Sequence, residues 1–103
     1  MIPDLKAAFA KFQEAGEGHQ FDRVCPQLSS FREVHAILLI EKLTKKYAAD
    51  YGSFAFAHAS HDEVWLNVRP DHLAECAEES DICDLVRCGL SYSAREEALS
   101  FFT

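Results

Sequence analysis

The sequence predicts an α+β fold in which helices pack on one face of a small antiparallel sheet, in the order α-α-β-β-α-α-β-β. Three observations support this prediction. Apolar residues recur at helical spacing in two N-terminal segments, two pairs of later segments alternate apolar and polar residues, and proline and glycine separate the segments. A chain of 103 residues is expected to fold as a single domain, residues 1–103. A chain of this size buries roughly two-thirds of its unfolded surface, enough for one core without disulfide or metal cross-links.

The first helix is expected to begin near Pro3, since proline suits a first helical turn. Its apolar residues at helical spacing are Leu5, Ala8, Phe9 and Phe12. Gly16 and Gly18 end the helix. Residues 19–28 are predicted to be a loop, because Pro26 prevents regular strand pairing there.

The second helix is predicted to run from Phe31 to about Ala49. A capping-box pattern at Ser30–Glu33 precedes its apolar run. The stripe that faces the core consists of Ala36, Ile37, Ile40, Leu43 and Tyr47. Further apolar residues point away from this stripe: Val34, Leu38 and Leu39. A helix that is apolar on several sides must be covered on several sides, either by the first helix and the sheet or by a second copy of the protein.

Residues 53–59 and 63–68 are predicted to form a β-hairpin, because both segments alternate with a period of two. Trp65 then points to the face opposite Val64 and Leu66. Pro70 stops the second strand.

Two short helices are predicted to follow, over residues 71–80 and 80–89, the second capped by Ser80 and ended by Gly89. Residues 90–103 are predicted to form a second hairpin. A helix from Ala94 is the alternative, because the polar centre of this segment favours helix.

In that hairpin Phe102 points away from Leu99 and Phe101. Trp65 and Phe102 would then both lie on the outer face of the sheet, which makes them candidate apolar anchors for a protein partner. The alternative is that a helix covers this face.

The charge of the chain is strongly uneven. Seventeen Asp and Glu against ten Lys and Arg give a net charge of −7, which disfavours direct binding to nucleic acid. The window Asp62–Asp84 holds eight carboxylates and one arginine, so it alone carries −7. No apolar run is long enough for a membrane span, and residues 1–15 lack the apolar core of a signal peptide. We therefore expect a cytoplasmic protein with no membrane partner.

The acidic window contains the candidate binding residues. We call them the acidic segment: Asp71, Glu75, Glu78, Glu79, Asp81 and Asp84. A concentrated negative face accelerates association with a basic protein surface. The alternative is a solvated surface that keeps a small protein soluble.

His72 and Cys76 are four residues apart on a predicted helix, which is the spacing of zinc ligands, and His58 and His61 near the preceding turn could complete a site. Structural zinc modules usually show two closely spaced ligand pairs, and this segment does not. The sequence is therefore interpreted as having no metal site and no cofactor.

Cys25, His35 and Asp22 are the residue types of a catalytic triad in a thiol enzyme, but nothing in the sequence marks Cys25 as an activated nucleophile. The four cysteines form no C-x-x-C pair, and the four glycines form no phosphate-binding loop. The sequence is therefore interpreted as non-enzymatic.

These observations favour a small acidic protein that binds and blocks a basic surface of a larger protein. In size, acidity and lack of a catalytic signature the chain resembles small inhibitors of phages and mobile elements, such as anti-CRISPR and anti-restriction proteins, and immunity proteins. This resemblance is compositional and is carried by no motif. The alternatives are a structural or assembly subunit that forms a homodimer through the second helix and, third, a metal-dependent or thiol enzyme.

Overall fold

A computed structural model describes residues 1–51, 56–59, 62–93 and 95–102, without the side chain of His58. The fold is α+β, as predicted, with a four-stranded antiparallel sheet in the order β1-β2-β4-β3. The strands are β1 (Phe56–Ala59), β2 (Glu63–Leu66), β3 (Leu90–Ser93) and β4 (Ala98–Phe102). Both predicted strand pairs are confirmed where they are described, so the alternative helix after Ala94 is excluded for the described part of the tail. Residues 53–55 of the first predicted strand lie outside the described residues.

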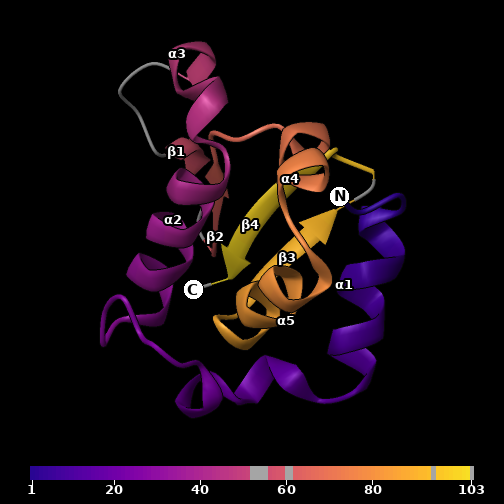
Figure 1. Ribbon diagram of the computed structural model, residues 1–103, viewed down its shortest axis with the longest axis vertical. Helices are drawn as coiled ribbons and strands as arrows, with labels where there is room; N and C mark the ends of the chain where they lie inside the picture. Colours follow the sequence, from indigo (N-terminus) through magenta and orange to yellow (C-terminus); the bar gives the residue numbers. More distant parts are fainter. Residues whose placement is uncertain (52–55, 60–61, 94, 103) are drawn as a thin grey trace.

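The helices lie on one face of this sheet, with α4 and α5 in front of the strands and α1 and α2 on either side of them (Figure 1). They are α1 (Leu5–Glu14), α2 (Arg32–Leu43), α3 (Ala48–Tyr51), α4 (Pro70–Cys76) and α5 (Glu79–Arg87). Three 3₁₀ turns join them: η1 (Glu17–His19), η2 (Phe21–Arg23) and η3 (Lys45–Tyr47). No helix in the described ranges is long and apolar enough to cross a membrane.

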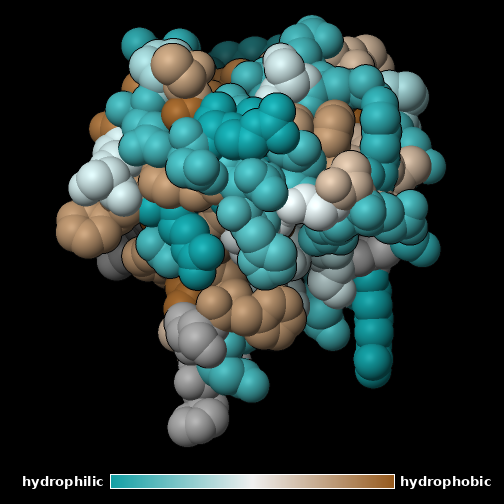
Figure 2. Space-filling view, turned by 90° about the horizontal axis from the view of Figure 1, so that it is seen from below, coloured by the Kyte–Doolittle hydropathy of each residue, from teal (hydrophilic) through white to brown (hydrophobic). Residues whose placement is uncertain are grey.

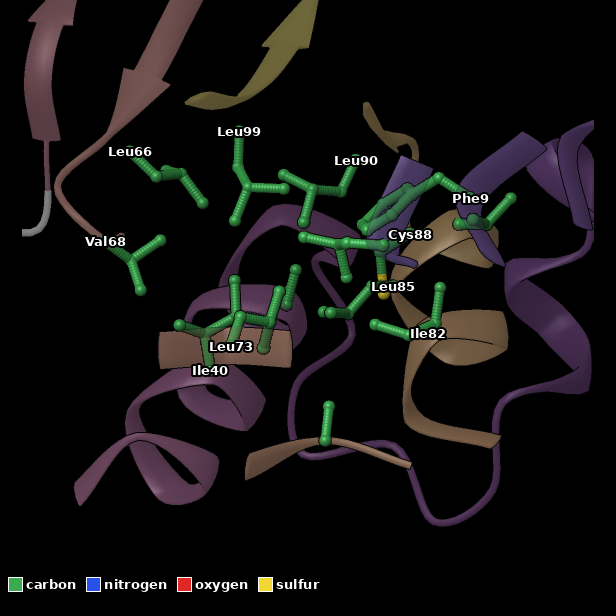
Figure 3. Packing of buried hydrophobic residues seen from close by; sticks show 14 of the residues in the cluster. Phe9, Ile40, Leu66, Val68, Leu73, Ile82, Leu85, Cys88, Leu90 and Leu99 are labelled. Atoms are coloured by element: carbon green, nitrogen blue, oxygen red, sulfur yellow. The ribbon is translucent and has the colours of Figure 1, made fainter. Parts of the chain in front are cut away.

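The core lies between the sheet and the helices and forms one cluster of buried side chains (Figure 3). On β3 and β4 every second residue contributes to it, as alternation requires, and β2 contributes Leu66, whereas the described side chains of β1 are exposed. Leu66, Leu90 and Leu99 reach it from the strands. Helical residues complete the cluster, among them Phe9, Ile40, Leu73, Ile82 and Leu85. Burying a side chain of this size contributes about 1.5–3 kcal/mol relative to leaving it exposed, so this layer dominates the stability of the fold.

The ends of the first two helices differ from the prediction. Helix α1 begins after Asp4, whose carboxylate accepts the backbone N–H of Ala7, so Pro3 precedes the helix and does not open it. The capping box at Ser30 is wrong, because Phe31 is the N-cap of α2 and no side chain caps it. Helix α2 ends at Leu43, six residues earlier than predicted. The Thr44 hydroxyl donates to the Ile40 carbonyl at 2.7 Å, a bond that often bends helices, and the chain continues as η3 and α3.

The boundary between α4 and α5 also moves. Helix α4 ends at Cys76, and Glu78 caps α5 in place of the predicted Ser80. The Glu78 carboxylate accepts the backbone N–H of Asp81, and the Asp81 carboxylate accepts the Glu78 N–H at 2.9 Å. Two carboxylates at a helix N-terminus satisfy free N–H groups and complement the helix dipole. Gly89 ends α5 with a φ of 88°, as predicted.

One side of α2 remains uncovered. We call its exposed apolar residues the α2 patch: Leu28, Phe31, Val34 and Leu38, which are 38% to 68% exposed. The sequence places Val34 and Leu38 correctly, but Leu39 packs against the core. The first helix does not cover the patch, since α1 packs mainly on α5, η1 and β3.

Candidate functional site

The acidic segment is the first candidate surface, and its α4 residues are paired within the chain. Glu75 accepts hydrogen bonds from the Lys46 ammonium at 2.7 Å and from the Tyr47 hydroxyl. These two bonds lower the pKa of Glu75, and the bond to Glu75 raises the pKa of Lys46. Asp71 accepts two hydrogen bonds from the guanidinium of Arg69, at 2.7 and 3.0 Å. Both carboxylates therefore already bind cations.

The carboxylates at the start of α5 hold the N-terminal region. Glu78 contacts the amino terminus of Met1 at 3.1 Å, and Glu79 contacts the Lys11 ammonium of α1 at 3.3 Å. Asp81 is committed to the capping box. Ion pairs this exposed contribute about 0–1 kcal/mol each, whereas a cap contributes about 1 kcal/mol.

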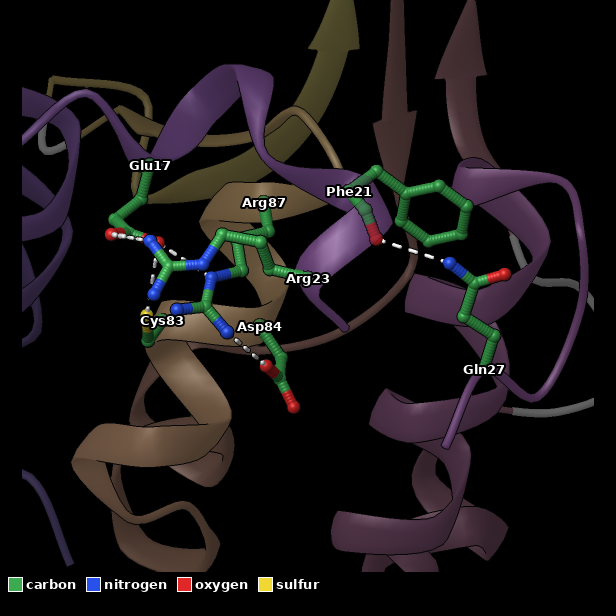
Figure 4. A network of polar contacts seen from close by, with 7 residues as sticks. All are labelled: Glu17, Phe21, Arg23, Gln27, Cys83, Asp84 and Arg87. Atoms are coloured by element: carbon green, nitrogen blue, oxygen red, sulfur yellow. Dashed lines mark hydrogen bonds and ion pairs between the residues drawn. The ribbon is translucent and has the colours of Figure 1, made fainter. Parts of the chain in front are cut away.

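Asp84 belongs to a polar network between α5 and η1 (Figure 4). The Arg87 guanidinium donates to Glu17 at 2.5 Å and to Asp84 at 3.5 Å. Arg23 lies 3.7 Å from the other oxygen of Glu17, and the Cys83 thiol donates to Glu17 at 3.7 Å. The hydrogen bond from Arg87 lowers the pKa of Glu17, while burial raises the pKa of Asp84. This network ties the turn after α1 to α5 and is structural in character.

All six residues of the acidic segment thus have partners inside the chain, drawn from different elements. They do not form one free negative surface. Within the described ranges, exposed carboxylates that make no ion pair lie elsewhere: Asp4, Glu14, Asp22, Glu41, Asp50, Asp62, Glu96 and Glu97. The side of the molecule that carries η1 and η2 is mostly hydrophilic, with apolar atoms in small separate areas (Figure 2).

The outer face of the sheet is the second candidate surface. Pairing of β2, β4 and β3 brings together residues of one face, which we call the outer sheet face: Glu63, Trp65, Ser91, Ser93, Ser100 and Phe102. Phe102 is 65% exposed and Trp65 is half-buried. None of the described helices covers Phe102, so one of the two candidate anchors is exposed and the other, Trp65, is partly accessible.

The outer sheet face is hollowed. A depression of about 390 Å³ is lined by all six of its residues together with Tyr92, Arg95 and Glu96. We call it the outer hollow. The Ser100 hydroxyl donates to the Glu63 carboxylate at 2.6 Å, and Ser100 is only 2% exposed although it faces away from the core. The bond fixes the orientation of Glu63 at the edge of the hollow.

Of the candidate zinc ligands, His72 packs against other side chains and Cys76 is a partly buried free thiol. His72 is buried, and its ring stacks on the ring of Tyr47 with 3.6 Å between the ring centroids. Its Nδ1 lies 2.6 Å from the Tyr51 hydroxyl oxygen. His61 and the side chain of His58 lie outside the described residues. Among the described residues, no three His, Cys, Asp or Glu side chains form a group that could hold a metal ion.

The candidate residues for nucleophilic catalysis differ in exposure, since His35 is buried and Cys25 is exposed. His35 is 3% exposed, and its Nδ1 accepts the backbone N–H of Leu28 at 3.0 Å. Its Nε2 has no hydrogen-bond partner among the described residues, and Cys25 is exposed. In the part of the chain that the structure describes, no hydrogen bond or ion pair joins Cys25 or His35 to Asp22.

Comparison with protein families, with curated proteins and with solved structures finds no match to this chain. The site therefore has to be judged from its own chemistry. Alternation along the strands located Trp65 and Phe102 in the sequence. It did not identify Glu63, Ser91 and Ser100 as part of this site. These residues come together through the pairing register of the strands, which cannot be read from the periodicity of one segment.

Proposed function

We propose that the chain is a non-enzymatic, cytoplasmic protein that docks on a basic surface of a larger protein and blocks it. A nucleic-acid-binding enzyme is the expected target, as for the inhibitors that phages and mobile elements direct against such enzymes. The observation that carries the proposal is the outer sheet face, where two accessible aromatic residues lie beside carboxylates on a protein of net charge −7.

The aromatic residues and the charge have different roles in this proposal. Trp and Phe bury 150–250 Å² each, and aromatic residues at the centre of an interface commonly account for 2 kcal/mol or more when truncated. The net negative charge accelerates encounter with a basic partner and disfavours acidic ones. Because the acidic segment is paired internally, the contact itself is assigned to Trp65 and Phe102 and the steering to the chain as a whole.

The test is capture followed by inhibition. Immobilised protein is exposed to a nuclease-treated host extract, and a retained basic protein is purified and assayed for nucleic-acid binding with and without the chain. We expect the wild type and Leu28→Ala, a control on the α2 patch, to retain and inhibit it, and Trp65→Ala/Phe102→Ala to lose both effects. Inhibition that persists in the double variant would exclude the outer sheet face, and capture without inhibition would exclude a blocking function.

A second candidate is assembly as a homodimer through the α2 patch. Val34 and Leu38 are exposed on α2, Leu28 and Phe31 are exposed just before it, and the N-terminus of α2 carries no side-chain cap. A symmetric pair of helices would cover the patch on both copies. Light scattering over a range of concentrations tests this: we expect a dimer mass for the wild type and for Glu41→Gln, and a monomer mass for Val34→Glu/Leu38→Glu. A wild-type monomer mass at every concentration would contradict assembly through α2.

A further inference from the structure

We propose that His35 is a pH-sensitive latch, which holds the segment before α2 against that helix while the imidazole is neutral and releases it when the imidazole takes up a proton. The segment comprises residues 25–31 and carries Leu28 and Phe31, two of the four residues of the α2 patch. The inference concerns the control of this part of the surface and does not depend on which partner the protein binds.

The segment before α2 has few attachments to the rest of the fold. Its residues are exposed except Ser29, which is partly buried, so it contributes little to the core. The Gln27 side chain donates to the Phe21 carbonyl at 3.1 Å, which joins the segment to η2 (Figure 4). Among the described residues, one hydrogen bond joins it to a side chain of α2: the Leu28 backbone N–H donates to His35 Nδ1 at 3.0 Å. Loss of this bond therefore frees Leu28 from the helix.

The bond to Leu28 requires one protonation state of the imidazole. A backbone N–H can only donate, so Nδ1 must be the unprotonated nitrogen and the ring proton must be on Nε2. A protonated imidazole carries a proton on both nitrogens and cannot accept. Since His35 is only 3% exposed, a new N–H group that faces the Leu28 N–H cannot turn to water unless the segment moves.

The other ring nitrogen has no acceptor in the neutral state. Nε2 is buried and has no hydrogen-bond partner among the described residues, which is uncommon for a buried polar atom. Asp84 on α5 is close enough to interact electrostatically with His35: burial raises the pKa of Asp84, and Arg87 and His35 act in the opposite direction. Arg87 lies 3.5 Å from the Asp84 carboxylate, a long hydrogen bond that holds it loosely. Protonation of His35 therefore exchanges the bond to Leu28 for an attraction to Asp84.

The other charges around the imidazole are mostly neutralised. Phe21 of η2 lies edge-on to the imidazole, with 6.0 Å between the ring centroids. The charged residues that η2, α2 and α5 carry close to these contacts in the sequence are Asp22, Arg23, Arg32, Glu33 and Arg87. All except Asp22 are in ion pairs, with Glu17 or with each other. Cys88 stays neutral, because burial raises its pKa to about 12. Asp84 is therefore the charge expected to set the pH of release.

NMR on the full-length protein measures the latch at single residues. Histidine changes its charge between about pH 5 and pH 8. The stability that depends on Glu17 and Glu75 is lost only below about pH 4.5, so the two effects separate. We expect the protection of the Leu28 amide against hydrogen exchange, corrected for the intrinsic pH dependence of exchange, to fall about tenfold from pH 7.5 to pH 5. The fall should follow the protonation of the His35 ring.

The Thr44 amide at the other end of α2, which donates to the Ile40 carbonyl, is the internal control and should keep its protection. Unchanged protection of Leu28 while the His35 ring takes up its proton would overturn the proposal. Equal losses at Leu28 and Thr44 would also overturn it, since they would indicate unfolding of the whole helix.

Three variants separate the latch from general effects of acid. In His35→Asn the amide oxygen can take the place of Nδ1 and does not titrate, so Leu28 should stay protected from pH 7.5 to pH 5. In Asp84→Asn the midpoint of release should move to lower pH by about one unit, because the protonated imidazole loses its attracting charge. His19→Asn, at an exposed histidine of η1, should behave as the wild type.

Circular dichroism checks that each variant is folded, and the Asp84→Asn measurement tests the proposal even if His35→Asn does not fold. Release of Leu28 in folded His35→Asn, or an unchanged midpoint in folded Asp84→Asn, would overturn the proposal.

Discussion

The acidic segment is prominent in the sequence but occupied by internal partners in the fold, whereas the outer sheet face is inconspicuous in the sequence but accessible in the fold. The acidic segment dominates the sequence, since its window carries the whole net charge. In the fold its six carboxylates bind Arg69, Lys46, the amino terminus, Lys11, the start of α5 and Arg87. The outer sheet face is inconspicuous in the sequence, yet folding leaves Phe102 exposed and gathers a carboxylate, serines and aromatic residues around one hollow.

The difference shows that a count of charges along the chain does not measure the charge available to a partner. Lys46 and Lys11 are far from the acidic window in the sequence, and only the packing of η3 and α1 brings them to it. Apolar residues give a more reliable indication at the surface, because a residue whose strand phase points away from the core has few ways to be covered except by a helix or a partner.

The largest expected effect on stability separates the buried side of α5 from the outer sheet face. Leu85 is fully buried, so Leu85→Ala should lower the free energy of unfolding by about 2–5 kcal/mol. Phe102→Ala, on the outer sheet face, should change it by no more than about 0.5 kcal/mol. Urea denaturation measures both. A large loss of stability in Phe102→Ala would mean that the outer sheet face is part of the core.

The next effect tests whether the acidic segment stabilises the fold. Glu78→Ala/Asp81→Ala removes the capping box of α5 and should lower the unfolding free energy by about 1–2 kcal/mol, because helix N–H groups lose their acceptors. The melting temperature should fall by several degrees. Glu96→Ala is the matched control and should melt like the wild type. A melting temperature that rises in the double variant would indicate that charge repulsion in the segment outweighs its caps.

Acidification should act through two other carboxylates that are paired within the chain. The pKa values of Glu17 and Glu75 are lowered in the folded protein by hydrogen bonds from Arg87 and from Lys46 and Tyr47. A lowered pKa adds stability above the unfolded value, near 4.5, and this stability is lost as pH falls through the folded value. Denaturation followed between pH 6 and pH 3 should therefore show a decline that Glu17→Gln/Glu75→Gln makes shallower. If the unfolding free energy of the double variant fell with pH as steeply as that of the wild type, the hydrogen bonds to Glu17 and Glu75 would not be the cause of the decline.

The smallest effect concerns exposed carboxylates near the outer sheet face. Asp62→Lys/Glu96→Lys should slow association with a basic partner severalfold at low salt and leave melting unchanged, because neither side chain makes an ion pair among the described residues. The difference should shrink towards 1 M salt, where the Debye length is about 3 Å. Stopped-flow mixing measures the association rate. A salt-independent difference would indicate a direct contact instead of steering.

Much of the fold could be predicted from local patterns. The period of two at residues 63–68 and around Leu99 indicated the strands, and helical spacing at Phe9 and Ile40 indicated the helices that cover them. The helix ends were harder to predict. The break at Thr44 depends on a side-chain bond to Ile40, and the start of α5 on two carboxylates replacing an expected serine cap.

The candidate site was predictable only in part, for a physical reason. Side-chain phase in a strand is local information, so Trp65 and Phe102 were found. The pairing of Glu63 with Phe102 and of Ser100 with Ser91 is long-range information that forms only when β2, β4 and β3 associate. The ion pairs that occupy the acidic segment are long-range for the same reason.

The central claim is that a partner binds the outer sheet face and not the acidic segment. The direct measurement is the dissociation rate of the captured basic protein from two variants, Trp65→Ala/Phe102→Ala and Glu75→Gln/Glu79→Gln. We expect the first to dissociate about 30-fold faster or more, because loss of about 2 kcal/mol or more at an anchor appears mainly in the off-rate, and the second to change less than about threefold. A large increase in the second variant with none in the first would contradict the account.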